Sequence, residues 1–417
     1  TGAPGKGRGN ARCCHRCGQK GTKIGMDTYC LICRSLSIVP ILRREQVPVH
    51  QNLVFDDQEA AVAVKRGDLD LVLCETCGFI FNRAFDASLL EYGNHYKNPQ
   101  EDSPTYTRYM SHLLSHLMER MSVRENRILE IGCGNGSFLR RLVEEGWDNI
   151  GLGFDPSYVG PLTDLEGRLR FVPHRYGAGD LHSHDDWVIC RHVVEHVPDP
   201  LHLLRVIRWT LDAGYKARVF LETPTVAWIL RNRVPWDFFY EHRSYFTHAS
   251  LRTACQIVGI TIETAQTEFG GQCLWLEGKV SDKRLVVALD PGDVPVLARA
   301  FGMGEARLLE DLRAKARELA THGGVAIWGA AAKGVTMANL LDPHRELVSC
   351  IVDINPQKQN RFLPGTGHPI VAPDELNELG ITAAILTNPM YRDEIAAMVE
   401  GWVNKVELVD PTEMARE

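Results

Sequence analysis

A glycine-rich stretch near residue 130 constrains the fold of this chain more than any other feature. Residues 128–131 form a mainly apolar run, Gly132, Gly134 and Gly136 follow at alternate positions, and residues 138–143 repeat apolar side chains at helical spacing. This order predicts a strand, a tight turn and a helix. Glycines let a ligand approach the backbone closely, and the start of the helix offers it free N–H groups. The sequence therefore predicts a nucleoside-binding loop.

The next strand completes this predicted site. Residues 149–154 end at Asp155, an acid placed to accept hydrogen bonds from both ribose hydroxyls. Glu130 begins a Glu-x-Gly-x-Gly-x-Gly pattern, which together with Asp155 resembles the S-adenosylmethionine (SAM) site of class I methyltransferases more than a dinucleotide site. Strands and helices alternate up to about residue 280, which predicts a parallel sheet.

A second polar cluster follows the strand at residues 186–190. It contains Arg191, His192, Glu195 and His196 and ends before Pro198. Ligands of open α/β sheets bind beyond the carboxyl ends of the strands, so we expect these residues on the cofactor side, with Arg191 and His192 among the cofactor contacts.

Aromatic and ionisable residues are interleaved over residues 236–246. Such a segment excludes water around a titratable group, which is what proton abstraction requires. His242 is the best candidate base. The alternative is an aromatic core cluster that contains a hydrogen-bonded histidine.

The cysteines are clustered, with seven of the 12 in the first 77 residues. Three Cys-x-x-Cys pairs stand out: Cys14 and Cys17, Cys30 and Cys33, and Cys74 and Cys77. Two such pairs complete the tetrahedral sulfur shell that Zn²⁺ favours. Six thiols exceed the need of one ion, so either the first and second pairs or the second and third pairs could bind it.

A second α/β unit is predicted after a charged helix at residues 305–321. Residues 325–334 read as a strand and a glycine-containing turn, and a strand at residues 348–352 ends at Asp353. The turn resembles a degenerate dinucleotide fingerprint, and it is not a phosphate-binding P-loop because Lys333 precedes the last glycine. Cationic and amide side chains over residues 355–367 suit an anionic or phosphate-bearing ligand.

Composition excludes several classes of protein. The net charge is −7 with acids and bases interspersed, so no basic stripe is available for nucleic acid. No run of 18 apolar residues predicts a membrane span, and the first residues lack the apolar core of a secretory signal. The sequence predicts a cytoplasmic protein.

Nearly the whole chain resembles SAM-dependent C-methyltransferases that methylate C-3 of nucleotide-linked keto-deoxysugars in antibiotic pathways. The most specific matches are Cys74-x-x-Cys77-Gly, residues 130–136, Tyr240-Glu241-His242-x-x-Tyr245-Phe246, and residues 329–334 with 353–366. The resemblance implies a zinc-binding domain with a lid loop (1–105), a class I SAM methyltransferase domain with a Rossmann-like core (106–281), a connecting helical segment (282–322) and a C-terminal Rossmann-like substrate-binding domain (323–417).

The resemblance also implies roles for particular residues. Zinc would be held by Cys30, Cys33, Cys74 and Cys77. His242 would be the base, Glu241 and Tyr240 would polarise the substrate, and His196 and a lid tyrosine, Tyr96, would line the same pocket. The family reads Tyr-His-Glu-His here, so either Tyr240 is displaced by one position or Phe239 replaces the family tyrosine.

The expected acceptor is a small molecule, with a nucleotide-linked keto-sugar as the leading candidate. An O- or N-methyltransferase of the same architecture is the main alternative. An oxidoreductase that works through the C-terminal domain, and a zinc ribbon that directs methylation of RNA or protein, are two further alternatives. The sequence gives no indication of the oligomeric state.

Overall fold

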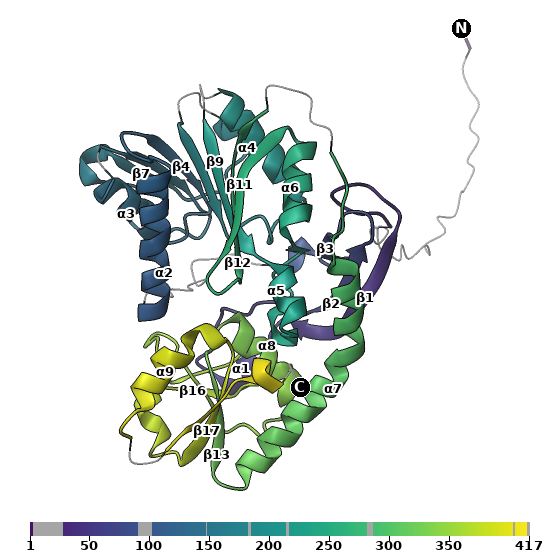
Figure 1. Cartoon of the computed structure of the whole chain (residues 1–417), viewed down its shortest axis with the longest axis vertical. Helices are drawn as coiled ribbons and strands as arrows, with labels where there is room; N and C mark the ends of the chain where they lie inside the picture. Colours follow the sequence, from purple (N-terminus) through teal and green to yellow (C-terminus); the bar gives the residue numbers. More distant parts are fainter. Residues whose placement is uncertain are drawn as a thin grey trace.

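The structure is a computed structural model that describes residues 1–2, 28–90, 102–146, 148–181, 185–213, 217–281, 287–402 and 405–414. Cys14, Cys17 and Tyr96 lie outside the described residues. The described residues form three sheets of four, eight and six strands (Figure 1).

The eight-stranded sheet carries the glycine-rich loop. Its order is β11-β12-β9-β8-β4-β5-β7-β6. The strands are β4 (Arg127–Ile131), β5 (Ile150–Phe154), β6 (Thr163–Asp164), β7 (Leu169–Val172), β8 (Trp187–Arg191), β9 (Arg218–Pro224), β11 (Ile260–Glu268) and β12 (Cys273–Val280). The predicted parallel sheet holds for β7, β5, β4, β8 and β9, whereas β6, β12 and β11 pair antiparallel at the edges. The edges differ because β11 and β12 are joined by a short hairpin turn, which only antiparallel strands allow.

Helices cover both faces of this sheet. Leu113 of α2 (Pro104–Ser115) and Leu139 of α3 (Ser137–Glu144) pack with Ile128 of β4. On the other face, α4 (Pro200–Ala213) and α6 (His248–Ile257) pack with Leu129, the next residue of β4. The strand order reverses between β4 and β8, and a ligand crevice forms at such a point beyond the carboxyl ends of the strands.

Two helices begin earlier than their apolar spacing predicts. The apolar residues at 109, 110, 113 and 114 predict a helix from about residue 109, whereas α2 begins at Pro104, where Ser103 Oγ accepts a hydrogen bond from Tyr106 N (3.2 Å). A π-helical turn follows α2 at His116–Arg120. The helix expected from residue 305 is α7, which spans Val294–Ala320. Proline in the first turn favours both starts.

The six-stranded sheet confirms the predicted second α/β unit. Its order is β15-β16-β14-β13-β17-β18, and only β15 pairs antiparallel. The strands are β13 (Gly324–Trp328), β14 (Cys350–Val352), β15 (Arg361–Phe362), β16 (Pro369–Val371), β17 (Ile381–Leu386) and β18 (Glu407–Val409). The helices of this unit are α8 (Ala332–Leu341), α9 (Arg392–Val399) and α10 (Pro411–Met414).

The four-stranded sheet joins distant parts of the chain. It contains β1 (Ile38–Pro48), β2 (Arg66–Cys74), β3 (Ile80–Asn82) and β10 (Ser244–Tyr245), so the aromatic stretch predicted to hold the base adds a strand to the N-terminal sheet. This sheet lies beside α5 (Val226–Arg231), and α7 runs from it to the six-stranded sheet (Figure 1). A short helix, α1 (Gln58–Val62), lies between β1 and β2 in the chain. The domain boundaries given by the sequence stay a prediction.

None of the described helices combines the length and the apolar character that crossing a bilayer requires.

Candidate active site and metal centre

The glycine-rich loop has the backbone shape that the sequence predicts. Gly132, Gly134 and Gly136 have φ angles of 78°, 55° and 79°, a region that side chains rarely allow. A Cβ atom on Gly132 would lie 2.1 Å from Val193 Cγ2, in the turn that follows β8. The loop after β4 and the turn after β8 therefore meet at the crevice of the sheet.

Two acidic side chains accompany this loop, one in β4 and one directly after β5. Asp155 Oδ2 accepts a hydrogen bond from Gly134 N (2.9 Å), so the acid at the tip of β5 faces the loop. Glu130 is 2% exposed, and its Oε2 has no hydrogen-bond partner among the described residues. Burial raises the pKa of Glu130 to about 7. A cationic ligand group would favour the ionised form of such a carboxyl.

The turn after β8 carries a charged network. Arg191 Nε donates to Glu222 Oε2 (2.5 Å) at the end of β9, and the Tyr109 hydroxyl donates to the other oxygen of the same carboxylate. His192 lies 3.3 Å from Glu222 Oε1 and 3.4 Å from Glu195 Oε1. Desolvation of the His192 ring is outweighed by these two acids, which raise the pKa of His192 to about 9. The network fixes the turn in place beside the loop.

His242 lies against His196. Their ring centroids are 4.7 Å apart, and Phe239 covers His242 at 4.2 Å. His242 is only 8% exposed, and burial, together with the nearby His196, His192 and Lys333, holds the pKa of His242 well below its usual value. The imidazole is therefore neutral at pH 7, the form that can accept a proton.

Glu241 connects this pair to the N-terminal part of the chain. Its carbonyl oxygen lies 3.0 Å from His196 Nδ1, and because a carbonyl only accepts, that nitrogen carries the hydrogen. The Glu241 side chain is fully buried, with Oε1 3.4 Å from His50 Nδ1. Its Oε2 has no hydrogen-bond partner in the described part of the chain.

Tyr240 points elsewhere. Its hydroxyl accepts from Asp86 N (2.8 Å) and donates to Asp86 O (3.3 Å). Its ring packs so closely on β2 that a Cβ on Gly67 would lie 2.4 Å from it. The structure therefore brings the side chains of Glu195, His196 and His242 together, and Glu241 contacts His196 through its backbone carbonyl. The Tyr240 hydroxyl is bound to backbone beside the N-terminal sheet.

Residues 235–246, called here the central segment, are held from two other parts of the chain. Lys333 Nζ from the C-terminal unit lies 2.7 Å from Asp237 Oδ2, and Trp236 Nε1 donates to Thr387 O (2.9 Å). Arg44 of β1 donates to the carbonyl oxygens at positions 235 (2.8 Å) and 238 (3.0 Å).

The sequence did not identify His50 and Lys333 as neighbours of the site. The available signals were the polar bend at residues 48–52 and the lysine inside a glycine turn.

The second and third cysteine pairs meet at one point. Cys30 Sγ is 3.6 Å from Cys77 Sγ, Cys33 Sγ is 3.5 Å from Cys74 Sγ, and all four sulfurs lie within 4.8 Å of one another. All four are free thiols. Sulfurs around tetrahedral Zn²⁺, each about 2.3 Å from the ion, lie about 3.8 Å apart, so the four residues fit that ion.

Comparison with protein families identifies two regions. Residues 106–265 match the model of a methyltransferase domain, and residues 298–406 match that of a C-methyltransferase C-terminal domain. The first region contains the glycine-rich loop, and the second contains the strands β13 to β17 of the six-stranded sheet.

Comparison with individual proteins agrees with this. The C-methyltransferase NovU of Streptomyces niveus is 24% identical over 371 residues, which cover 83% of this chain and 86% of that protein. A ubiquinone biosynthesis O-methyltransferase of Yersinia pestis is 31% identical over 130 residues, 30% of this chain and about half (51%) of that protein. Magnesium protoporphyrin IX methyltransferase from Synechocystis PCC 6803 is a structural neighbour at 17% identity and a TM-score of 0.34, over 45% of this chain and 91% of its own, which is too remote to add weight. The chain is a SAM-dependent methyltransferase with a class I core and a second α/β domain.

Proposed function

We propose that this SAM-dependent methyltransferase transfers the methyl group to a carbon next to a carbonyl of a small acceptor, a nucleotide-linked keto-sugar of secondary metabolism. The observation that carries the proposal is His242, a buried and neutral imidazole beside a second histidine. Carbon becomes nucleophilic when a neighbouring carbonyl lets a base remove its proton, whereas most heteroatom acceptors already carry a lone pair. The similarity to NovU, whose name is that of a C-methyltransferase, supports the same choice.

The residues of the chain divide the reaction between them. His242 takes the C–H proton, and the electron pair of that bond moves onto the carbonyl oxygen as an enolate. A hydrogen bond from His196 Nε2 would stabilise the enolate oxygen, while Nδ1 of the same ring donates to Glu241 O. Bound SAM supplies the electrophilic methyl group. Gly132, Gly134, Gly136 and Asp155 would hold the cofactor, whose methyl group would pass from sulfur to the carbon and leave S-adenosylhomocysteine.

The C-terminal unit is proposed to hold the anionic end of the acceptor. Lys358 is 5% exposed, and its Nζ lies 3.5 Å from Asp353 Oδ2 and donates to Ala330 O (3.2 Å) at the carboxyl end of β13. This places a buried cation at the position where an α/β sheet binds its ligand. A nucleoside diphosphate has the complementary charge.

The four cysteines are proposed to bind one structural Zn²⁺. Thiolates fill all four positions of the tetrahedron, so no position remains for substrate or water. Thiols that must bind metal stay reduced in the cytoplasm, where we expect the protein to work.

The test is the position of the new methyl group. The protein is incubated with ¹³C-methyl-labelled SAM and a nucleotide-linked keto-deoxysugar whose carbonyl neighbours C-3, and the product is examined by NMR. The expected signal is a methyl group on a quaternary or tertiary ring carbon. A labelled methyl on oxygen or nitrogen would exclude C-methylation.

A further inference from the structure

A polar turn is buried between β1 and α1. Val49, His50, Gln51 and Asn52 are 0%, 5%, 1% and 7% exposed. Connecting segments usually run over the protein surface, because a buried turn must satisfy its polar groups inside the protein. The burial of a histidine in such a turn therefore calls for a specific partner.

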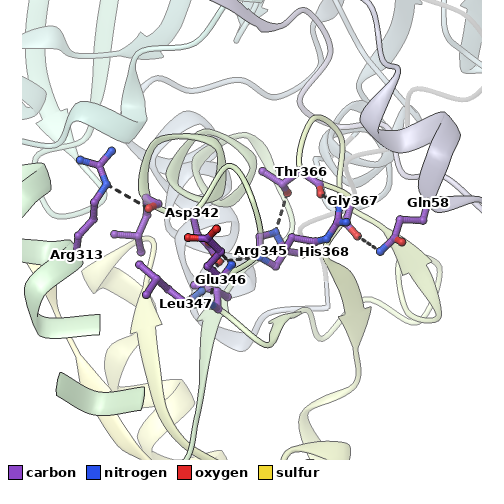
Figure 2. A network of polar contacts seen from close by, with 11 residues as sticks. Gln58, Arg313, Asp342, Arg345, Glu346, Leu347, Thr366, Gly367 and His368 are labelled. Atoms are coloured by element: carbon purple, nitrogen blue, oxygen red, sulfur yellow. Dashed lines mark hydrogen bonds and ion pairs between the residues drawn. The ribbon is translucent and has the colours of Figure 1, made fainter. Parts of the chain in front are cut away.

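The segment that carries this turn is anchored on the C-terminal domain. Gly365 N donates to Ala61 O (2.8 Å), and Arg66 donates back to Gly365 O (2.9 Å). Gln58 donates to Gly367 O (2.8 Å), and Figure 2 shows this side chain reaching the loop. Residues 58–66, which follow the turn, are thus hydrogen-bonded to the backbone of the loop at residues 365–367.

The loop at residues 365–368 is held in place by buried polar contacts of His368. His368 Nε2 lies 3.3 Å from Asp342 Oδ2, and its Nδ1 lies 2.8 Å from Thr366 Oγ1 (Figure 2). Both ionisable side chains are buried. Desolvation of Asp342 is outweighed by the hydrogen bonds from His368 and from three backbone N–H groups, which hold the pKa of Asp342 below its usual value. A fixed anchor of this kind sets the position of the turn that contains His50.

His50 faces the carboxylate of Glu241, the residue that precedes His242 in the sequence. Glu241 is fully buried, and burying a charge is costly unless it is paired. Among the described residues, His50 Nδ1 at 3.4 Å is the only ion-pair partner of Glu241, and it contacts Oε1 alone. The second oxygen remains for an outside hydrogen-bond donor.

We propose that His50 is a positioning residue: it holds Glu241 Oε1 so that Oε2 can accept a hydrogen bond from a hydroxyl group of the acceptor, close to the carbon that reacts. This rests on the proposed function. It narrows the acceptor to carbonyl compounds with a hydroxyl near the reacting carbon.

The test compares three variants of the full-length protein. His50→Leu removes the ring nitrogen, His50→Asn keeps an amide N–H near the position of Nδ1, and His344→Leu changes an exposed histidine as the control. The readouts are exchange of the acceptor C–H for deuterium, with a nucleotide-linked keto-deoxysugar as the probe, and NMR of the ¹⁵N-labelled histidine rings without acceptor.

His50→Leu should slow the exchange by about 100-fold, since small misplacements of positioned groups cost that much. His50→Asn should recover most of the loss, and both variants should keep the affinity of the wild-type protein for S-adenosylhomocysteine. The melting temperature should fall in His50→Leu, which leaves the buried Glu241 carboxylate without its partner, and should stay near the wild-type value in His50→Asn. Exchange at the wild-type rate in His50→Leu would overturn the proposal, as would equal losses in both variants together with a lower melting temperature in both.

The NMR readout separates this proposal from the proposed function. If the wild-type protein does not exchange the probe at all, the proposed function fails for that acceptor class. The positioning role is then decided by the ring signals of His196 and His242, which should shift in His50→Leu and stay near their wild-type values in His50→Asn and His344→Leu. Unchanged signals in His50→Leu would overturn it.

Discussion

The cofactor loop and the central segment are built in opposite ways. Residues 130–136 and Asp155 form one strand-turn-helix unit with the next strand, and the hydrogen bond from Gly134 to Asp155 spans 21 residues of sequence. The central segment is held by contacts from far away: His50 to Glu241 spans 191 residues, and Trp236 to Thr387 spans 151. We therefore expect cofactor binding to depend on one sheet, and the proposed chemistry on the acceptor to depend on contacts from all three described sheets.

The largest expected effect comes from removing the metal centre. Cys74→Ser should abolish zinc binding and detectable turnover, because structural zinc contributes about 10–16 kcal/mol to folding and the N-terminal sheet includes β10 of the central segment. S-adenosylhomocysteine should still bind, as measured by calorimetry. Cys255→Ser, at a buried thiol of α6 outside the metal cluster, is the matched control. If Cys74→Ser lost cofactor affinity and turnover together, the cofactor loop and the central segment would fold as one unit. The difference drawn between the two regions would then be wrong.

Asp155→Ala tests the other side of the comparison. Hydrogen bonds to a charged group contribute about 1.5–3 kcal/mol, so the affinity for S-adenosylhomocysteine should fall by about 10- to 100-fold. Asp155→Asn keeps one acceptor oxygen, so its affinity for S-adenosylhomocysteine should lie between those of the wild type and Asp155→Ala. Deuterium exchange of the acceptor without cofactor should stay unchanged. Affinity equal to that of the wild type in Asp155→Ala would remove this acid from the cofactor site.

The smallest expected effect is a shift in pH dependence. The positive charge of Lys333 contributes to the lowered pKa of His242, so Lys333→Met should let that pKa rise. The base works in its neutral form, and the acid limb of the exchange rate should therefore move to higher pH, by less than about one unit for a single partly screened charge. Lys315→Met on α7, whose lysine pairs with Glu318, is the control. A shift toward lower pH would show that the C-terminal domain does not act on the base through this charge.

The sequence predicted the strand, the glycine-rich turn and the helix at residues 128–143 correctly because the evidence for them is local. Only 26 residues, from Glu130 to Asp155, contain the alternating glycines, the helical spacing and the acid at the end of the next strand. It also placed His242 on an aromatic segment, which the structure shows as buried. The resemblance was needed to predict which cysteine pairs meet, because spacing alone does not reveal this.

The surroundings of the base could not be predicted in the same way. His50 reaches Glu241 only because β1, α1 and the loop at Gly365 pack together, and no periodicity in the sequence records that contact. Tyr240 shows that a position next to the predicted base in the sequence does not fix where a side chain points. Its place beside Glu241 and His242 suggested a role in catalysis, but its hydroxyl is bound by the backbone of Asp86.

The central claim is that His242 removes a proton from carbon without help from the cofactor loop. The direct measurement is deuterium exchange at the carbon next to the carbonyl of a nucleotide-linked keto-deoxysugar in D₂O, without SAM. The wild-type protein should exchange this position, and His242→Asn should be slower by about 100- to 10,000-fold with unchanged affinity for S-adenosylhomocysteine. Exchange by His242→Asn at the wild-type rate would contradict the account.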